Sequence, residues 1–344
     1  MTRPPAQVAG DVVRWQRTHG RHGLPWQQGR EPYRVWLSEV MLQQTQVSVV
    51  LGYYERFLQR FPDVRALAAA PLDDVLGLWS GLGYYSRARN LHRCAQAVVD
   101  LHGGEFPRSA ALLERLPGIG RSTAAAIAAF CFGERVAILD GNVKRVLARV
   151  LAFGGDLGTS SGVNGLWDRA TGLLPADAAD MPAYTQGLMD LGATICLARQ
   201  PSCLLCPLQA SCLANRQGQA TEFPVKTRSL KRSSQSLWLL RAQSPDGSVW
   251  LEKRPVPGVW AGLYCLPLFE SREALELCVP ARSRKRLLDE EPFLHMLTHK
   301  DLHLHPVRAD VQRNVLETRE GGWFGASDWP ALGLPAPVRR LLSA

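Results

Sequence analysis

Two carboxyl side chains in the first half of the chain stand where acid–base chemistry is possible. Glu39 follows Val35 by four residues and precedes Leu42 by three, so helical periodicity places it on an apolar face. A carboxyl desolvated in this way has a raised pKa and can hold a proton near neutral pH, as a general acid must. The alternative interpretation is a buried glutamate satisfied by hydrogen bonds or a salt bridge.

Asp140 follows an apolar run, residues 136–139, and precedes a helix predicted over residues 143–151. Asp140 or Asn142 is therefore expected at a helix start, where capping is the simplest role. A carboxylate there can also face a positively charged sugar. Because cleavage of a glycosidic bond uses one carboxyl as acid and a second to stabilise or trap the oxocarbenium ion, Glu39 and Asp140 fit that division of labour.

Four of the eight cysteines crowd into residues 196–212. Six, two and five residues separate them in turn, so one short loop can wrap four thiolates around a single centre. Structural zinc is the alternative, but zinc sites favour two close cysteine pairs and only one is present, so we predict one 4Fe-4S cluster. The predicted ligands are Cys196, Cys203, Cys206 and Cys212. We assign no chemistry to Cys94, Cys131, Cys265 and Cys278.

A glycine-containing connection, residues 117–120, joins helices predicted over residues 111–116 and 121–132. Gly118 and Gly120 let the backbone approach a ligand closely, and the N–H groups that open the second helix suit a DNA phosphate. Such contacts position DNA without reading its sequence. We interpret the segment as a helix-hairpin-helix, with an ordinary turn between helices as the alternative.

These residues must be positioned by helices, because apolar side chains recur at helical spacing from about residue 32 to residue 212. Residues 216–235 are polar, basic and without period, which indicates an interdomain linker. Strand-like runs at 236–242 and 248–253 flank a Ser-Pro-Asp-Gly turn and predict a smaller α+β domain. The predicted boundaries are residues 1–215, 216–235 and 236–344.

Composition limits the class of partner. A chain of 344 residues favours two domains, and a net charge of +9 with a pI near 9.4 suits a polyanion, either nucleic acid or a membrane surface. There is no apolar run long enough for a membrane span and no signal-peptide core, so we expect a cytoplasmic protein.

Five ordered motifs, residues 32–47, 81–90, 116–123 and 138–146 together with the four clustered cysteines, closely resemble the MutY family of adenine DNA glycosylases. The resemblance runs from about residue 21 to residue 212, and more loosely from residue 258 onward. It implies a two-lobed all-α helix-hairpin-helix glycosylase domain of the endonuclease III superfamily, with an iron-sulfur loop, followed by a C-terminal α+β Nudix-like domain.

The resemblance also implies an activity. Such an enzyme flips adenine out of double-stranded DNA and removes it where it lies opposite 8-oxoguanine or guanine. Ser122 stands where bifunctional endonuclease III relatives have a catalytic lysine, so we expect a monofunctional enzyme with weak or no AP lyase activity. We expect a monomer associated with the nucleoid. A bifunctional pyrimidine glycosylase, a non-catalytic damage-binding module and a nucleotide hydrolase are the alternatives.

Site residues carry over from matching motif positions. Glu39 matches the acid that protonates adenine, Asp140 the carboxylate that stabilises the sugar, and Asn142 a residue that holds that site. The expected DNA contacts are Leu42, Gln44, Tyr84, Gly118, Gly120, Ser122, Lys144, Thr298 and His299. The expected adenine pocket comprises Arg21, Trp26 and Gln186.

The C-terminal segment 258–267 resembles the Nudix-related domain that recognises 8-oxoguanine in this family. No glutamate-rich metal-binding helix follows Pro267, so we expect recognition without pyrophosphate hydrolysis. The lesion-reading loop departs from the family's usual Phe-Ser-His, since this chain has Leu297, Thr298 and His299. Loss of the aromatic ring leaves the strength of 8-oxoguanine discrimination open. The nearby histidines are interpreted as solvent-facing or DNA-facing rather than as a metal site.

Overall fold

The computed structural model describes residues 5–227 and 231–343 and divides the chain into two compact units. The first unit comprises Met1–Tyr54, Asp63–Ala68 and Arg93–Ser229. The second comprises Glu55–Pro62, Ala69–His92 and Leu230–Ala344. Two stretches of the helical half, Glu55–Pro62 and Ala69–His92, therefore belong to the same unit as the C-terminal domain.

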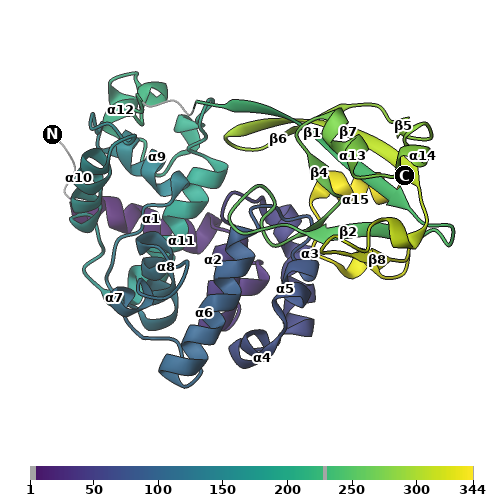
Figure 1. Ribbon diagram of the computed structural model, residues 1–344. Helices are drawn as coiled ribbons and strands as arrows, with labels where there is room; N and C mark the ends of the chain where they lie inside the picture. The colour runs from purple at the N-terminus through teal and green to yellow at the C-terminus, as the bar shows by residue number, and fades with distance from the viewer. Residues whose placement is uncertain (1–4, 228–230, 344) are drawn as a thin grey trace. The chain divides into compact units, whose positions relative to one another are not determined.

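The N-terminal part is helical, as the periodicity predicts (Figure 1). Its α-helices are α1 (Pro5–His19), α2 (Pro32–Met41), α3 (Val47–Arg60), α4 (Val64–Ala69), α5 (Leu72–Leu78), α6 (Ser86–His102), α7 (Ala110–Leu113), α8 (Arg121–Phe132), α9 (Gly141–Val150), α10 (Ser160–Thr171), α11 (Met181–Thr194) and α12 (Leu213–Arg216). Single turns of 3-10 helix are η1 (Pro25–Gln27), η2 (Ala178–Asp180), η3 (Cys203–Leu205) and η4 (Ala220–Glu222).

Helix α11 packs against α1, α8 and α9 in the core of the first unit. Glycines make this close packing possible. A Cβ atom on Gly187 would lie 2.7 Å from Cγ1 of Val12, and one on Gly192 would lie 2.5 Å from Cβ of Asn142. Because such distances are far below a normal van der Waals contact, α11 can lie this close to α1 and α9 only without side chains at these points.

Helix α9 begins earlier than the periodicity predicts. Asp140 is its N-cap, and its Oδ1 accepts a hydrogen bond from the backbone N–H of Val143 at 2.6 Å. This bond satisfies a donor that the first turn of a helix otherwise leaves unpaired. The apolar face of α9 then faces the core through Val143, Val146, Leu147 and Val150.

The C-terminal part is an α+β domain. Its strands are β1 (Ser233–Gln243), β2 (Val249–Lys253), β3 (Tyr264–Cys265), β4 (Leu268–Phe269), β5 (Leu288–Asp289), β6 (Phe293–Met296), β7 (Lys300–Asp310) and β8 (Gly322–Phe324). Its helices are α13 (Arg272–Leu277), α14 (Ala281–Arg284) and α15 (Ala336–Ser343), with 3-10 turns η5 (Arg313–Val315) and η6 (Trp329–Ala331). Strand β1 thus begins inside the predicted linker 216–235, of which residues 228–230 lie outside the described residues.

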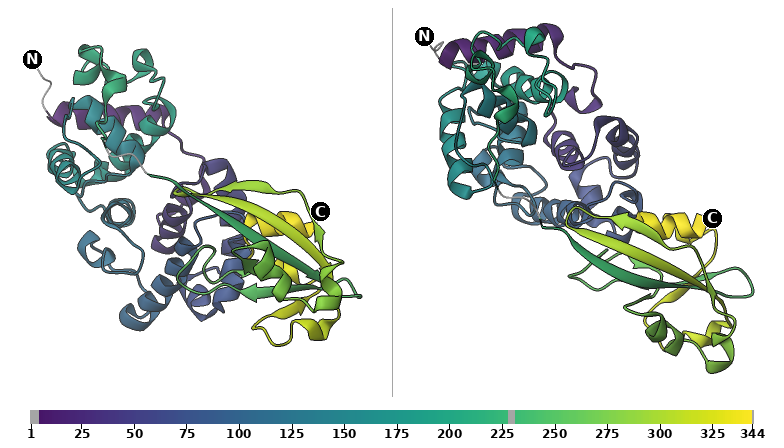
Figure 2. Two further views of the ribbon diagram at one scale, coloured as in Figure 1. Left: turned by 45° about the horizontal axis from the view of Figure 1, so that its top comes forward. Right: turned by 90° about the horizontal axis from the view of Figure 1, so that it is seen from above.

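The strands form one sheet in the order β3-β2-β1-β7-β5, with β4 also pairing with β1, β6 with β7 and β8 with β2. The two long strands β1 and β7 run parallel, side by side in every view (Figures 1 and 2), and the other pairs are antiparallel. Alternate residues of β1 enter two cores, Leu239 on one face and Leu240 on the other. Val338 of α15 joins the first core and Leu275 of α13 the second, so both faces are covered.

The helical stretch Ala69–His92 packs closely against the end of the C-terminal domain within the second unit. The hydroxyls of Ser80 and Tyr85 both donate to the carbonyl oxygen of Leu334, at 3.1 and 2.8 Å. A Cβ atom on Gly77 would lie only 2.2 Å from the carbonyl oxygen of Ala331. The two segments therefore form one packed body although the contacting residues are about 250 positions apart in sequence.

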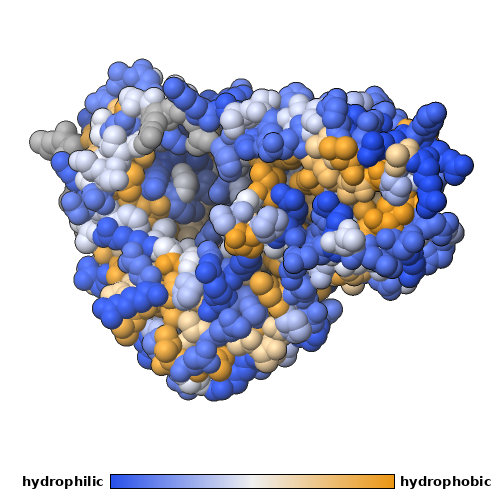
Figure 3. All heavy atoms as spheres, viewed as in Figure 1, coloured by the Kyte–Doolittle hydropathy of each residue, from blue (hydrophilic) through white to orange (hydrophobic). Residues whose placement is uncertain are grey.

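The visible surface is mostly hydrophilic, with scattered hydrophobic groups (Figure 3). Within residues 5–227 and 231–343, no helix is both long enough and apolar enough to cross a membrane.

Candidate functional site

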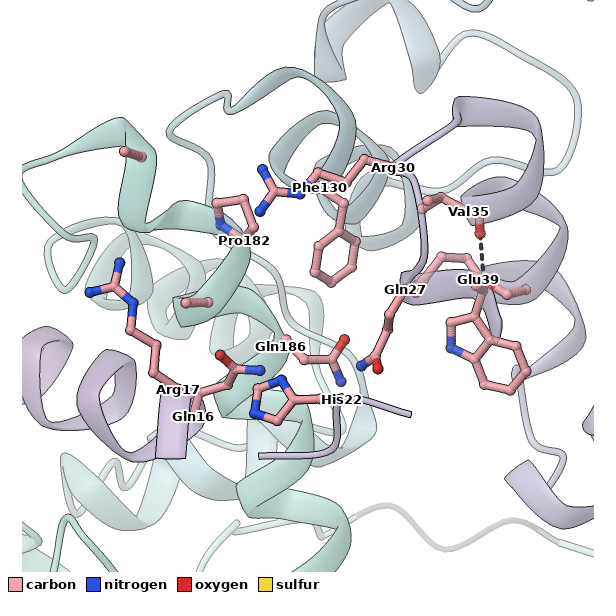
Figure 4. Close-up of a pocket in the computed structure, with 14 residues that line it drawn as sticks. Gln16, Arg17, His22, Gln27, Arg30, Val35, Glu39, Phe130, Pro182 and Gln186 are labelled. Carbon is pink, nitrogen blue, oxygen red and sulfur yellow. Dashed lines mark hydrogen bonds between the residues drawn. The ribbon is translucent and has the colours of Figure 1, made fainter. Parts of the chain in front are cut away.

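A cavity of about 330 Å³ lies in the first unit and is lined by side chains from α1, η1, α2, α8 and α11 (Figure 4). Its wall includes Trp26, Gln27, Ser38, Glu39, Phe130 and Gln186. The wall therefore combines polar groups with aromatic rings, as is usual for a pocket that binds a small ligand.

Glu39 is the acidic side chain of this cavity. The neighbouring residues Val35 and Trp36 are buried, whereas Glu39 is only partly buried because it faces the cavity. Burial raises the pKa of Glu39 from 4.5 to about 8, with a further contribution from the negative charge of Asp140. Glu39 is therefore protonated near neutral pH and can act as an acid.

Asp140 lies close enough to Glu39 for its charge to act on that carboxyl. Burial raises the pKa of Asp140, while hydrogen bonds from the backbone N–H groups of Val143 and Asn142 oppose that shift. The positive charges of Arg145 and Lys144 also favour the ionised form. Capping of α9 and a role beside Glu39 are therefore compatible, since the helix start holds the carboxylate in place.

Asn142 is held by Arg145, a residue that the sequence analysis did not identify. Nη2 of Arg145 donates to Oδ1 of Asn142 at 2.9 Å and to the carbonyl oxygen of Gly192 at 2.6 Å. Nε of Arg145 donates to the carbonyl oxygen of Cys196 at 2.7 Å. One guanidinium therefore connects the start of α9, the end of α11 and the start of the cysteine loop.

Two of the three expected adenine-pocket residues, Trp26 and Gln186, line the cavity. Trp26 is buried and meets Tyr54 edge-on, with ring centroids 5.3 Å apart. Arg21 instead binds Asp190, a buried carboxylate that also accepts a hydrogen bond from Gln186. Asp190 was not identified from the sequence, although its position four residues after Gln186 on a helix was a usable signal.

The predicted helix-hairpin-helix is formed by α7, the turn and α8, although α7 ends at Leu113, before the predicted limit. Gly118 has a left-handed backbone with φ of 75°, and Gly120 is the N-cap of α8. Among the described residues, no side chain caps this helix start. The hydroxyl of Ser122 accepts a hydrogen bond from the backbone N–H of Leu139 at 3.2 Å and so ties α8 to the segment before Asp140.

Two residues expected to enter the DNA have strained backbones. Gln44 has φ of 58° and Tyr84 has φ of 49°, and both side chains are exposed. Such left-handed conformations are unfavourable for residues other than glycine and gather at functional sites. Leu42, at the end of α2, and Lys144, in the first turn of α9, are half-buried.

The second unit brings Tyr84 to the predicted lesion-reading loop. The hydroxyl oxygens of Tyr84 and Thr298 lie 2.9 Å apart. Arg87 stabilises the loop that carries Tyr84, because its guanidinium donates to the carbonyl oxygens of Leu82 and Gly83, at 3.2 and 3.1 Å. The exposed Thr298 and His299 form the turn between β6 and β7.

All four clustered cysteines line one pocket next to Arg149 of α9. The guanidinium of Arg149 is buried, donates to Sγ of Cys196 at 3.2 Å and donates to the carbonyl oxygens of Leu197 and Ala198. In the part of the chain that the structure describes, no three Cys, His, Asp or Glu side chains converge as around a single metal ion.

Comparisons with known proteins agree with this geometry. Residues 37–160 match the model of the HhH-GPD superfamily base excision DNA repair protein, and residues 238–344 match that of the NUDIX domain. The adenine DNA glycosylase of Buchnera aphidicola subsp. Acyrthosiphon pisum is 34% identical over 336 residues, which cover 96% of this chain and 95% of that protein. The chain belongs to the MutY family of adenine DNA glycosylases.

Further MutY-family relatives extend to eukaryotes. The human adenine DNA glycosylase is 43% identical over 218 residues, which cover 60% of this chain and 39% of the human protein. A solved thermostable thymine-DNA glycosylase is 27% identical with a TM-score of 0.54, and covers 62% of this chain and 97% of its own. An endonuclease III–DNA complex, at 21% identity and a TM-score of 0.51, covers 63% of this chain and 98% of its own and shows the same helical fold.

The expected fold and enzyme class are thereby confirmed. This MutY-family chain is a DNA N-glycosylase of base excision repair, a hydrolase that acts on adenine, and it has a helix-hairpin-helix glycosylase fold and a Nudix-like domain.

Proposed function

We propose that this adenine DNA glycosylase removes adenine opposite 8-oxoguanine or guanine and leaves the DNA strand uncut. The observation that carries the proposal is the position of Glu39, whose pKa burial raises to about 8, in the wall of a cavity that Trp26 and Gln186 also line. A base inside the duplex stack cannot reach such a cavity, so adenine must first be flipped out.

The reaction divides between the two carboxyls. Glu39 donates its proton to the flipped adenine, and the electrons of the bond between the sugar and the base leave with the base. The carboxylate of Asp140 stabilises the oxocarbenium ion that remains. Water then adds to the sugar, and its proton restores the acid form of Glu39.

Two amides give the cavity a polarity suited to adenine. The carbonyl oxygen of the Gln27 side chain accepts the backbone N–H of Leu24 at 3.2 Å, which leaves its amide nitrogen as a donor. The amide nitrogen of Gln186 donates to Asp190 at 2.8 Å, which leaves its oxygen as an acceptor. Adenine offers an acceptor at N7 beside a donor at N6, whereas guanine offers two acceptors there, so the pair supports selection of adenine.

For the opposite strand we propose that Tyr84 enters the helix beside the lesion pair and that Thr298 and His299 contact 8-oxoguanine. The contact between Tyr84 and Thr298 supports a joint role. Leu42 and Gln44 would enter the helix near the pair, and the N–H groups that follow Gly118 and Gly120, together with Ser122 and Lys144, would hold the backbone. The enzyme would act on chromosomal DNA as a monomer.

The absence of strand cutting is inferred from Ser122. A lyase forms a Schiff base through an amine, whereas Ser122 has a hydroxyl that is already bound to the N–H of Leu139. Lys144 is the nearest lysine in the neighbouring motif, and its charge acts on Asp140. We therefore propose that Lys144 stabilises the charge of Asp140 and contacts a DNA phosphate.

The four clustered cysteines fit a 4Fe-4S cluster. They supply four sulfur donors around one pocket, and the buried Arg149 donates a hydrogen bond to Sγ of Cys196. When bound, the cluster would cross-link residues 196–212. We propose that Arg149 and Arg145 transmit this order to the start of α9, where Asp140 lies.

A single-turnover assay on three duplexes tests the proposal. The substrates pair adenine with 8-oxoguanine, adenine with guanine, and thymine glycol with adenine, each read with and without alkali. Adenine excision that becomes a strand break only after alkali is the expected result. Spontaneous nicking at thymine glycol would favour a bifunctional lyase, and binding without release would favour a damage-binding module.

A further inference from the structure

Asp190 is a fully buried carboxylate on α11, with 0% of its surface exposed. One helical turn before it lies Gln186, whose amide nitrogen donates to Oδ1 of Asp190 at 2.8 Å. Oδ1 also accepts from Nε of Arg21 at 2.7 Å and lies 2.7 Å from Nη2 of the same guanidinium, while Oδ2 accepts from the backbone N–H of Arg21 at 2.9 Å. Neither proton transfer from Glu39 nor charge stabilisation by Asp140 uses this carboxylate.

The chemistry of Asp190 determines the orientation of the Gln186 side chain. An ionised carboxylate only accepts hydrogen bonds, so the nitrogen of the Gln186 amide must face it and the oxygen must face away. Gln186 is part of the cavity wall, and its amide points toward the same space as those of Gln16 and Gln27 (Figure 4). The cavity therefore receives an acceptor at this position.

The burial of Asp190 argues against a role in packing alone. A buried carboxylate is costly unless it is paired and hydrogen-bonded, and an apolar side chain of similar size commonly stabilises a core at least as well. Arg21 supplies the countercharge and two further donors. This network orders the Gln186 side chain of the cavity, although an apolar residue in place of Asp190 would give a simpler core.

We propose that Asp190 is a positioning residue for base selection, which acts by holding the Gln186 oxygen toward the cavity so that a purine with an amino group at position 6 is preferred. Arg21 then acts as the ion-pair partner that holds Asp190 in place rather than as a contact to the base. This inference rests on the proposed function, because it requires adenine to occupy the cavity.

The test compares wild type with Asp190→Asn on two substrates, adenine and unsubstituted purine, each opposite 8-oxoguanine. Asparagine has nearly the same shape but can present either an oxygen or an NH2 group, so the Gln186 amide is free to turn over. We expect the adenine rate to fall about tenfold while the purine rate changes little, because only adenine loses a hydrogen bond. The two substrates differ in the intrinsic lability of the bond between sugar and base, but this difference cancels because the same two substrates are compared in both enzymes.

A second ion pair near α1 and α11 provides the control. Arg17 of α1 binds Asp180, directly before α11, at 2.7 Å, and both side chains of this pair are more exposed than those of Arg21 and Asp190. Asp180→Asn should leave the adenine-to-purine ratio unchanged. An equal ratio in wild type and Asp190→Asn would overturn the proposal, as would the same fall in Asp180→Asn.

A second variant keeps the inference testable if Asp190→Asn does not fold. Gln186→Met removes both polar atoms but keeps the length of the side chain. We expect it to lower the rate on adenine and to leave unchanged or raise the rate on hypoxanthine, whose oxygen at position 6 is repelled by an acceptor. A loss on both bases would contradict the orientation assigned to Gln186.

Two outcomes separate the role of Asp190 from the proposed function. If wild type releases no adenine, the proposed function fails. If wild type releases adenine and Asp190→Asn keeps the wild-type ratio, only the role of Asp190 fails.

Discussion

At the scale of single residues, Glu39 shows how a simple spacing becomes a chemical property. Its position on the apolar face of α2 follows from the neighbouring Val35 and Leu42. The pKa of about 8 has a second cause, the charge of Asp140, which lies about a hundred residues further along the chain. The apolar pattern therefore indicates the direction of the shift, and the fold adds to its size.

Glu39→Gln should abolish most excision without abolishing DNA binding. The amide keeps the shape of the side chain but cannot donate a proton to the base, and general acids contribute about 10²- to 10⁴-fold to rate. Single-turnover rates and binding to a duplex with adenine opposite 8-oxoguanine measure the two effects separately. Glu55→Gln, which removes a charge from an exposed position, is the control and should retain the wild-type rate. Normal excision by Glu39→Gln would refute the assignment of the acid.

The pH dependence follows from the raised pKa of Glu39. The protonated form is the acid, so the single-turnover rate should hold below pH 8 and fall about tenfold per pH unit well above it. Stability has the same sign: because the folded pKa is above the unfolded value of 4.5, the contribution is complete below about pH 4.5 and is lost as the pH rises through about 8. Glu39→Gln should therefore gain stability relative to wild type across that range in denaturant titrations. A rate that still rises above pH 8.5 would contradict this pKa.

At the scale of elements, the hairpin between α7 and α8 depends on backbone conformation. Gly118→Ala places a Cβ at φ of 75°, which costs about 1 to 2 kcal/mol, and should weaken DNA binding because the N–H groups that open α8 move. Urea unfolding and binding to undamaged duplex measure the two effects. Gly52→Ala in α3 is the control, since no atom lies within 4 Å of a Cβ built there and alanine favours a helix by about 0.5 to 1 kcal/mol. Unaltered DNA affinity in Gly118→Ala would remove the hairpin from the proposed interface.

The cysteine loop is the second element whose role is testable. Cys203→Ser should lose the visible absorption and the iron of an iron-sulfur cluster, with a lower melting temperature, because residues 196–212 lose their cross-link. Cys278→Ser, in the second unit, is the matched control and should keep both signals. If the wild-type protein contained stoichiometric zinc and no iron, the four cysteines would form a zinc site and the cluster proposal would be wrong.

At the scale of the whole molecule, each of the two units is built from segments that are not contiguous in the sequence. The segment Ala69–His92, which carries Tyr84, packs with the C-terminal domain, which carries Thr298. The proposed lesion-reading surface of the second unit is therefore built from both halves of the sequence. No periodicity reports such a contact, since it pairs residues more than 200 positions apart.

Gly77→Ala tests this packing. The new Cβ would lie 2.2 Å from the carbonyl oxygen of Ala331, so α5 or the segment around η6 must move, at a cost of about 1 to 3 kcal/mol. Hydrogen exchange should rise together in residues 72–78 and 329–334, while Gly52→Ala should leave both segments unchanged. Faster exchange in only one of the two segments would contradict their packing as one body.

The sequence by itself determined the local patterns from which the chemistry is proposed. The apolar spacing around Glu39, the cap at Asp140, the cysteine spacing and the glycines of the hairpin are local patterns, and their physical meaning needs only the helix geometry of the residues beside them. The helical first part, the α+β second part and the family all followed from such patterns. Element limits were less accurate, as at α7 and α9, because caps and tertiary packing determine where a helix ends.

Only the tertiary structure decided which distant groups meet. Asp190 orients Gln186 and binds Arg21, Arg145 connects Asn142 to the cysteine loop, and Tyr84 meets Thr298. Each of these networks includes a partner far away in the chain: Arg21 for Asp190, Cys196 for Arg145 and Thr298 for Tyr84. Buried polar groups must find such partners, but the pattern of apolar residues does not specify which ones, because that depends on how the helices pack.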